Sequence, residues 1–494
     1  MNVCSYHLQE AGATPVQELS FALATAVAIL DSMKASGAIP DAEFPQAVGR
    51  ISFFVNAGMR FVTEMCKMRA FVDLWDELLE TRYGVDNPKF RRFRYGVQVN
   101  SLGLTEQQPE NNVYRILIEM LAVTLSKKAR ARAVQLPAWN EALGLPRPWD
   151  QQWSMRMQQI LAYETDLLEF EDLFDGNPAV DAKVEALKEG ARHELANIDG
   201  MGGAVDAIEY MKARLVDSNA DRLNRIEAGE TVVVGVNKFT EGEPSPLMSE
   251  DGGIMVVDPA VEQDQIDRLN TWRFERDAAA VKAALADLRA AAAEGRNVMP
   301  ASIACAKAGV TTGEWAAQMR AVHGEYRGPT GVSKSVSNKT EGLDDIRDAV
   351  NAVSDRLGRR LKFLVGKPGL DGHSNGAEQI AFRARDCGMD IDYEGIRLTP
   401  EQIVSAAQDT QAHVVGLSIL SGSHIPLVED LMERMRAAGM GHVPVIVGGI
   451  IPEEDARRLR AMGVAKVYTP KDFNLNAIMM DIVTLADPKE IAAE

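Results

Sequence analysis

The sequence predicts an α/β protein with parallel sheets, because two β/α rhythms run through the chain. From Lys362 onward, short β-rich runs alternate with amphipathic stretches, which is typical of a doubly wound sheet of the flavodoxin-like (Rossmann-like) kind. In residues 1–175, strand-like runs recur roughly every 40 residues, which is the rhythm of a (β/α) TIM barrel. Only four units are present. A closed barrel needs eight, so these residues predict a partial barrel.

The last domain, placed at residues 346–494, has the clearer pattern. Its apolar runs have the length of strands that are buried on both faces of a sheet. Strands are expected at 362–366, 389–394, 413–418, 443–449 and 465–469, with helices at about 375–388, 400–410, 425–439, 453–462 and 475–487.

The N-terminal domain, placed at residues 1–175, has longer helices between its strands. Strand-like runs are expected at 5–7, 51–58, 95–100 and 133–139, and long helices at 15–36, 58–83 and 109–128. The residues between the two domains, 176–345, are helix-rich and predict a helical linker region. Within it, the Ala-rich segment from Trp272 to Gly295 is expected to be helical.

Composition excludes several classes of protein. The chain has 494 residues, with 53 basic and 71 acidic side chains and a net charge of −18, so nucleic acid and anionic membrane surfaces are poor partners. The sequence has no uninterrupted apolar run of about 18 residues, so no transmembrane helix is expected. The N-terminus also lacks a signal-peptide pattern. Four scattered cysteines argue against a disulfide framework or a CxxC zinc site, and they favour a cytoplasmic location.

The first β/α turn of the last domain carries the motif D-x-H-x-x-G, formed by Asp371, His373 and Gly376. A histidine just after a strand lies at the carboxyl edge of the sheet, where open α/β sheets bind ligands. Asp371 can accept a hydrogen bond from the second ring nitrogen, and Lys367 can hydrogen-bond that carboxylate. Gly372 lies between them and lets a bulky ligand approach the backbone.

A lone histidine of this kind is usually an ordinary loop residue. Here, however, three other strand ends bring small and polar residues to the same edge of the sheet. These are Ser418 and Leu420 after the third strand, Gly448 and Gly449 after the fourth, and Thr469 after the fifth. The alternative is a flavodoxin-like receiver domain, but no acidic pocket accompanies these positions.

The combination of DxHxxG, SxL and GG at these separations resembles the cobalamin-binding domain of cobalamin-dependent mutases and of methionine synthase. The resemblance implies that His373 is the lower axial ligand of cobalt and displaces the dimethylbenzimidazole of the cofactor. The displaced nucleotide tail would then run into a slot lined by Ser418, Leu420, Gly448 and Gly449, with Thr469 as a weaker assignment.

The N-terminal residues narrow the family. SYHLQEAGATPVQELSFALA, GRISFF, KMRAFVDLW, SLGLTEQQPENN, VQLPAWNEALGLP and GVNKF resemble segments of acyl-CoA mutases such as methylmalonyl-CoA mutase. The stretch 135–176 is most similar to ethylmalonyl-CoA mutase. Because these segments are those of a mutase barrel, the corrinoid methyl transfer of methionine synthase is disfavoured. The resemblance implies that residues 1–175 are the C-terminal half of a (β/α)8 barrel.

The expected substrate residues follow from this resemblance. His7 ends a strand-like run, where an imidazole can polarise a thioester carbonyl, and the matching histidine of the family contacts the migrating thioester. Arg50 and Ser52 flank Ile51 in an Arg-x-Ser pattern that binds coenzyme A in the family, and a guanidinium suits pyrophosphate oxygens. Gln135 matches a glutamine near the substrate, and Gln98 is a further pocket candidate.

The implied activity is that of an isomerase: an adenosylcobalamin-dependent radical rearrangement of a dicarboxylic acyl-CoA. The substrate is either ethylmalonyl-CoA, giving methylsuccinyl-CoA, or methylmalonyl-CoA, giving succinyl-CoA. Implied partners are a second copy in a homodimer and a GTPase reactivating chaperone.

The family has about half a barrel before the segment that carries His7. We expect that half to come from an upstream start, from a separate N-terminal half-barrel chain or from a second copy. The alternative function is a truncated, non-catalytic cobalamin-binding protein.

Overall fold

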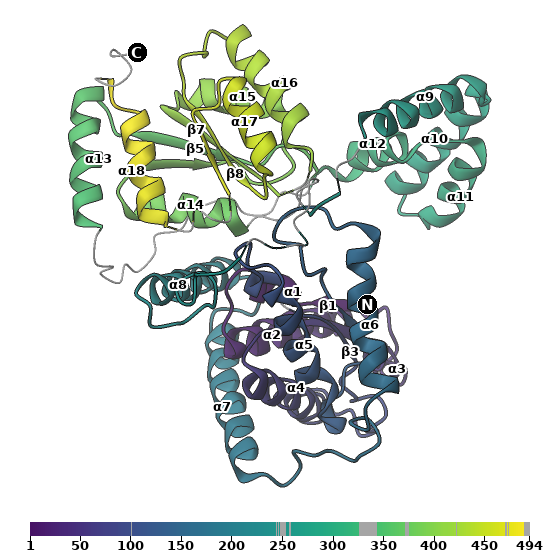
Figure 1. Cartoon of the computed structure of the whole chain (residues 1–494). Helices are drawn as coiled ribbons and strands as arrows, with labels where there is room; N and C mark the ends of the chain where they lie inside the picture. Colours follow the sequence, from purple (N-terminus) through teal and green to yellow (C-terminus); the bar gives the residue numbers. More distant parts are fainter. Residues whose placement is uncertain are drawn as a thin grey trace. The chain divides into compact units, whose positions relative to one another are not determined.

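The computed structural model contains two parallel sheets and a separate group of helices (Figure 1). It describes residues 1–99, 101–243, 245, 247, 253–255, 258–325, 343–370, 375–420, 422–469, 472 and 474–488. One compact unit comprises residues 1–255 and 331–494, and the other comprises residues 256–330. The expected α/β class with parallel sheets is confirmed.

The N-terminal sheet has four parallel strands in the order β1-β2-β3-β4. The strands are β1 (Asn2–Cys4), β2 (Ser52–Ala57), β3 (Tyr95–Val99) and β4 (Ala133–Gln135). The helices are α1 (Tyr6–Glu10), α2 (Pro15–Ala35), α3 (Phe44–Val48), α4 (Phe61–Thr81), η1 (Ser101–Gly103), α5 (Asn111–Thr124), η2 (Lys127–Ala129), α6 (Pro148–Tyr163), α7 (Pro178–Gly200) and α8 (Ile208–Glu227).

The first of these strands lies earlier than the sequence predicted, and the last is shorter. A strand-like run was expected at residues 5–7, but β1 ends at Cys4 and the chain turns into α1. The Ser5 hydroxyl donates to Glu18 (3.1 Å), which holds the chain in that turn. The run expected at 133–139 ends at Gln135, shortly before Pro137, because proline has no N–H for the ladder.

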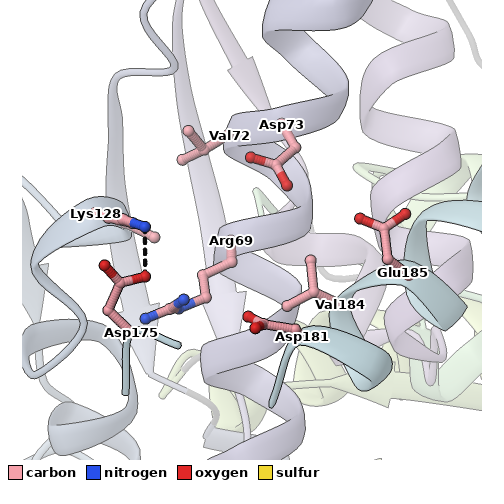
Figure 2. Close-up of a pocket in the computed structure, with 9 residues that line it drawn as sticks. Arg69, Val72, Asp73, Lys128, Asp175, Asp181, Val184 and Glu185 are labelled. Atoms are coloured by element: carbon pink, nitrogen blue, oxygen red, sulfur yellow. Dashed lines mark hydrogen bonds and ion pairs between the residues drawn. The ribbon is translucent and has the colours of Figure 1, made fainter. Parts of the chain in front are cut away.

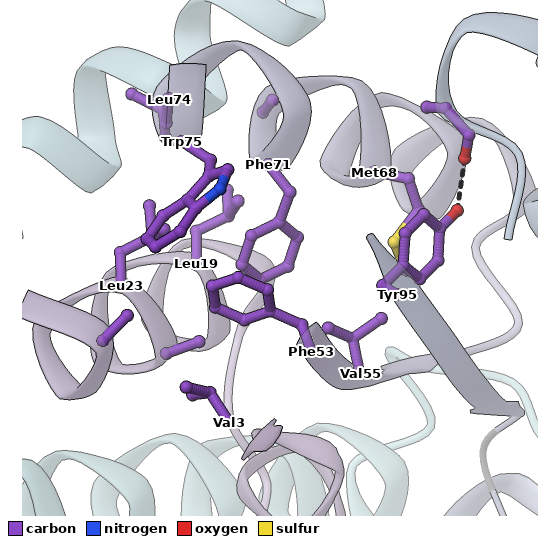
Figure 3. Packing of buried hydrophobic residues seen from close by; sticks show 14 of the residues in the cluster. Val3, Leu19, Leu23, Phe53, Val55, Met68, Phe71, Leu74, Trp75 and Tyr95 are labelled. Atoms are coloured by element: carbon purple, nitrogen blue, oxygen red, sulfur yellow. Dashed lines mark hydrogen bonds between the residues drawn. The ribbon is translucent and has the colours of Figure 1, made fainter. Parts of the chain in front are cut away.

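One face of the N-terminal sheet carries the apolar core. Figure 3 shows Phe53 and Val55 of β2 packed with Phe71 and Trp75 of α4 and with Leu19 of α2. Helix α2 is long and apolar enough to cross a membrane by length and composition, but most of it is buried in this core against α4 and α7. Its length and apolar composition are therefore explained by its place in the core.

The opposite face of this sheet is polar and only partly covered. Strands alternate their side chains between faces, so the residues that do not join the core share this second face. Asn2, Cys4, Ala133 and Gln135 are exposed there, Ser52, Phe54, Gly96 and Gln98 are half-buried, and Asn56 is buried. Parallel sheets usually have both faces covered, so this face is unusual.

The C-terminal sheet has five parallel strands in the order β6-β5-β7-β8-β9. Its elements are α13 (Asp344–Leu357), β5 (Lys362–Gly366), α14 (Asn375–Asp386), β6 (Asp390–Tyr393), α15 (Pro400–Thr410), β7 (Val414–Ile419), α16 (His424–Ala437), β8 (Val445–Gly449), α17 (Glu453–Ala461), β9 (Lys466–Tyr468) and α18 (Leu475–Leu485). One apolar cluster joins the sheet to α13, α14 and α18, and a second joins its other face to α15, α16 and α17 (Figure 1).

The region between the two sheets is helical in the described residues. Helix α7 packs against α2 and α4 as part of the N-terminal core. The second compact unit contains α9 (Pro259–Glu275), α10 (Ala278–Ala293), α11 (Val298–Ala308) and α12 (Thr312–His323). The helix expected from Trp272 to Gly295 is in fact broken, because Asp277 caps α10 by accepting from the N–H groups of Ala279 and Ala280.

Candidate functional site

The residues expected to bind the cofactor gather at the carboxyl edge of the five-stranded sheet. In the strand register, Ser418 pairs with Gly448, and Gly448 pairs with Tyr468, which is followed by Thr469. Lys367 directly follows β5, and Gly376 lies in the first turn of α14. These residues come from four β/α turns at one edge, where open α/β sheets bind their ligands.

Three of the central residues of the motif lie outside the described residues. They are Asp371, Gly372 and His373. The assignment of His373 as the cobalt ligand therefore stays a prediction. Within the described ranges, no group of three His, Cys, Asp or Glu side chains is placed to hold a metal ion.

Lys367 is fully buried, which is rare for lysine unless its ammonium group is paired. Its Nζ donates to the backbone oxygen of Ser418 (2.8 Å) and contacts the Ser418 hydroxyl (3.3 Å). Lys367 thus ties the end of β5 to the end of β7. The amino group of a buried lysine therefore lies beside Ser418, one of the residues of the expected cofactor slot.

Two glycines at this edge lie close to β7. A Cβ on Gly449 would lie 1.8 Å from the backbone oxygen of Ile419, so only glycine fits there. A Cβ on Gly376 would lie 3.7 Å from the Ser418 hydroxyl, which puts α14 beside β7. The small glycines of α14 and β8 leave room for a bulky group to approach the backbone at this edge.

The N-terminal sheet presents a second set of expected residues at its carboxyl edge. His7 is exposed in α1, three residues after β1 ends, and its ring lies 4.6 Å from that of Tyr6. Gln98 pairs in register with Asn56 on one side and with Gln135 on the other. The Gln98 side chain donates to the Tyr6 hydroxyl (3.1 Å), so Tyr6 and Gln98 are joined across the polar face.

Arg50, Ile51 and Ser52 lie at the opposite edge of the same sheet. Arg50 is exposed and Ile51 is buried in the core. Ser52 begins β2, and its backbone N–H donates to the oxygen of Met1 (3.0 Å). The fold therefore does not bring Arg50 and Ser52 next to His7; it separates them by the length of the sheet.

A buried charged cluster under the carboxyl edge was missed by the sequence reasoning. Lys67 is fully buried with its Nζ 2.5 Å from carboxylate oxygens of both Glu18 and Glu64. Nearby, Glu119 is completely buried, and neither of its carboxyl oxygens has a hydrogen-bond partner among the described residues. Burial, with the charges of Glu64 and Glu10, raises the pKa of Glu119 to about 9. The presence of charged residues within the apolar faces of α4 and α5 could have indicated this buried cluster.

A cavity on the helical side of the N-terminal part lies away from these residues. It has a volume of about 210 Å³ and lies between α4, η2 and α7. Figure 2 shows the residues that line it. Lys128 pairs with Asp175 across it, and Arg69 pairs with Asp172 (2.7 Å). None of the expected site residues lines it, and its lining has two basic and four acidic side chains, an acidic balance that does not suit an anionic acyl-CoA, so we do not assign it to the site.

Comparison with known proteins decides between an acyl-CoA mutase and a non-catalytic cobalamin-binding protein. The methylmalonyl-CoA mutase family model matches residues 1–325, and the B12 binding domain model matches residues 361–472. The chain belongs to the methylmalonyl-CoA mutase family. This confirms the resemblance to cobalamin-dependent acyl-CoA mutases, which are isomerases, and favours it over a non-catalytic cobalamin-binding protein.

Three curated relatives of this mutase illustrate the range of similarity. Ethylmalonyl-CoA mutase of Cereibacter sphaeroides is 74 % identical over 494 residues, which is 100 % of this chain and 75 % of the relative. Ethylmalonyl-CoA mutase of Methylorubrum extorquens is 62 % identical over 99 % of this chain and 71 % of the relative. Methylmalonyl-CoA mutase of Cereibacter sphaeroides is 33 % identical over 95 % of this chain and 65 % of the relative.

Proposed function

We propose that this mutase converts ethylmalonyl-CoA to methylsuccinyl-CoA with adenosylcobalamin as its cofactor. The observation that carries the choice of substrate is the difference in identity, 74 % to an ethylmalonyl-CoA mutase against 33 % to a methylmalonyl-CoA mutase of the same organism. Conversion of methylmalonyl-CoA to succinyl-CoA is the second candidate, because the family model that matches residues 1–325 is named methylmalonyl-CoA mutase.

The proposed architecture joins a substrate barrel to a cofactor domain. The polar, partly covered face of the four-stranded sheet supports residues 1–175 as half of a (β/α)8 barrel, with this face turned inward. β1 and β4 each have one neighbour in the described sheet, so further β/α units can pair at both edges. The order β6-β5-β7-β8-β9 supports a flavodoxin-like domain at 346–494, with 176–345 as the linking region.

The cofactor residues keep the roles that the resemblance implies. When bound, adenosylcobalamin supplies the carbon-centred radical that removes a hydrogen atom from the substrate. His373 would be a ligand of cobalt, with Asp371 fixing its tautomer. The buried Lys367 would hydrogen-bond the Asp371 carboxylate, in addition to its contact with the backbone oxygen of Ser418. Ser418, Leu420, Gly448 and Gly449 would line the slot for the nucleotide tail, with Thr469 as a weaker assignment. Gly372 and Gly376 would let the cofactor approach the backbone closely.

The substrate would lie along the polar face. His7 would donate a hydrogen bond to the thioester oxygen while the thioester group moves to the neighbouring carbon, and Gln135 would contact the substrate nearby. Arg50 and Ser52, with Ile51 between them, would bind the coenzyme A end. β2 has six residues at about 3.3 Å each, so roughly 20 Å separates these two edges. A long acyl-CoA lying parallel to the strands can contact both.

The remaining proposals concern partners and location. We propose that the barrel is completed by further β/α units, in the same or a separate chain, and that the complete enzyme is a homodimer served by a GTPase chaperone. The cytoplasm is the proposed location, because adenosylcobalamin and acyl-CoA esters are intracellular metabolites.

Turnover of both esters tests the proposal directly. The protein, purified from its own cells and supplied with adenosylcobalamin, is assayed with ethylmalonyl-CoA and with methylmalonyl-CoA. We expect isomerisation of ethylmalonyl-CoA with a kcat/KM at least about tenfold higher than for methylmalonyl-CoA, the usual scale of one methylene. The reverse preference would support the second candidate. No isomerisation of either ester would refute the proposed function.

A further inference from the structure

The buried lysine under the carboxyl edge of the N-terminal sheet has no part in the roles described so far. Lys67 of α4 meets Glu18 of α2 and Glu64 of α4, both at 2.5 Å. Burial disfavours its charged form, but the two carboxylates outweigh burial and raise the pKa of Lys67. A buried ion pair of this kind is often no more stabilising than apolar residues of the same volume. Stability alone therefore does not explain it.

Glu18 holds the place where the chain leaves β1. One of its carboxylate oxygens accepts from the Ser5 hydroxyl (3.1 Å) and from the backbone N–H of Asn56 (2.9 Å). Ser5 directly follows β1, and Asn56 lies near the end of β2. Glu18 thus joins the ends of two neighbouring strands, while its other oxygen faces Lys67.

Lys67 and Asn56 hold the end of α1, which follows the turn after β1. The Lys67 ammonium group donates to the backbone oxygen of Asn56 (2.8 Å) and to the side-chain oxygen of Gln9 (3.3 Å). The Asn56 side chain donates to Glu10 (3.2 Å). Residues on both sides of His7 are therefore fixed by side chains from α2, α4 and β2.

We propose that the Glu18–Lys67 pair is a positioning device that sets the orientation of α1 and so aims His7 at the substrate. Neither residue touches the substrate; both act through the segment 5–10. The inference rests on the proposed function, because it assigns His7 a place beside the thioester. A side chain misplaced by about 1 Å can cost on the order of 100-fold in rate.

Glu64 provides a matched control. It contacts the same ammonium group at the same 2.5 Å distance and lies at the same depth. In the part of the chain that the structure describes, the Glu64 carboxylate pairs with Lys67 and holds no group of residues 5–10. Glu64→Gln therefore perturbs the buried charge without releasing the turn.

The experiment compares Glu18→Gln with Glu64→Gln. It measures kcat and KM for ethylmalonyl-CoA with saturating adenosylcobalamin, and hydrogen–deuterium exchange of the peptide that covers residues 5–10. For Glu18→Gln we expect kcat to fall by about 10- to 100-fold with KM changed less than about twofold, and faster exchange in this peptide. For Glu64→Gln we expect kcat within about threefold of wild type and unchanged exchange there.

Equal losses of kcat in the two variants, or an unchanged Glu18→Gln enzyme, would overturn the positioning role. If Glu18→Gln does not fold, Ser5→Ala replaces it, because it removes only the hydroxyl bond to Glu18. That variant should lose about three- to tenfold in kcat and show faster exchange, and wild-type values for both would refute the proposal. Inactivity of the wild-type protein would count against the proposed function, whereas exchange in residues 5–10 would still test the positioning device.

Discussion

The two parallel sheets of this mutase differ in how their faces are covered. The five-stranded sheet carries an apolar cluster on each face, built with α13, α14 and α18 on one side and α15, α16 and α17 on the other. The four-stranded sheet carries its main apolar cluster on one face, and the other face bears Ser52, Asn56, Gln98 and Gln135.

This difference separates two ways of building a site. In the five-stranded sheet both faces are used for stability, so the site residues occupy the ends of the strands. In the four-stranded sheet one face is left to polar side chains, and a ligand can lie along it. Where this polar face meets the core, charged side chains such as Lys67 are buried, and they need partners of opposite charge.

The largest expected effect concerns the polar face. His7→Ala should lower kcat for ethylmalonyl-CoA by about 100-fold, the usual scale for a positioned hydrogen-bond donor. His193→Ala, which removes an exposed histidine from α7 on the helical side, serves as the control. Steady-state kinetics of both variants check this prediction. Equal rates for His7→Ala and wild type would remove His7 from the reaction.

The next prediction concerns the tight edge of the five-stranded sheet. Gly449→Ala should destabilise that domain by about 1–3 kcal/mol, because its Cβ would overlap the backbone oxygen of Ile419. Gly448→Ala should cost much less, since its nearest neighbour would be Tyr468 Cβ at 3.9 Å. Hydrogen–deuterium exchange of the β7 and β8 peptides measures both. Similar protection in the two variants would show that the strand ends are not packed as described.

A third prediction uses the raised pKa of Glu119, about 9, in the N-terminal part. The native state keeps this proton between the ordinary glutamate pKa and pH 9, whereas the unfolded state releases it. Stability should therefore fall as the pH rises through this range, by up to about 1.4 kcal/mol per pH unit. Glu119→Gln should remove this slope in urea unfolding followed by tryptophan fluorescence, because four of the six tryptophans lie in residues 1–175. The same pH dependence of stability in wild type and Glu119→Gln would show that another group causes it.

A fourth prediction has the opposite pH dependence and belongs to the five-stranded domain. Burial, with Arg359 and Lys362 nearby, lowers the pKa of His413 to about 4, and its Nδ1 accepts from the Lys362 N–H (2.8 Å). The unfolded state binds this proton first, so stability should fall as the pH drops from 6.5 toward 4. His413→Asn should flatten that dependence in exchange measurements on β5 and β7 peptides. A steeper loss in the variant would contradict it.

The sequence predicted the five-stranded domain more accurately than the four-stranded one, for a physical reason. Strands buried on both faces, such as β5 and β7, are continuous apolar runs, and their limits were predicted to within a residue or so. β1 has three residues and ends in a turn fixed by Glu18, thirteen positions after Ser5, so no local pattern marks it.

The site shows the same contrast between local and distant causes. The edge that gathers Ser418, Gly448 and Thr469 follows from strand order, which the β/α rhythm reveals. The burial of Lys67 depends on Glu18 and Asn56, which come from other elements. A single lysine in the helix sequence gives no sign of such partners.

The most direct test of the cofactor assignment is a crystal structure of the protein grown with adenosylcobalamin. We predict a bond between cobalt and a ring nitrogen of His373, with the dimethylbenzimidazole displaced into the slot beside Ser418 and Gly448. A dimethylbenzimidazole still bonded to cobalt, with His373 turned away, would contradict this assignment.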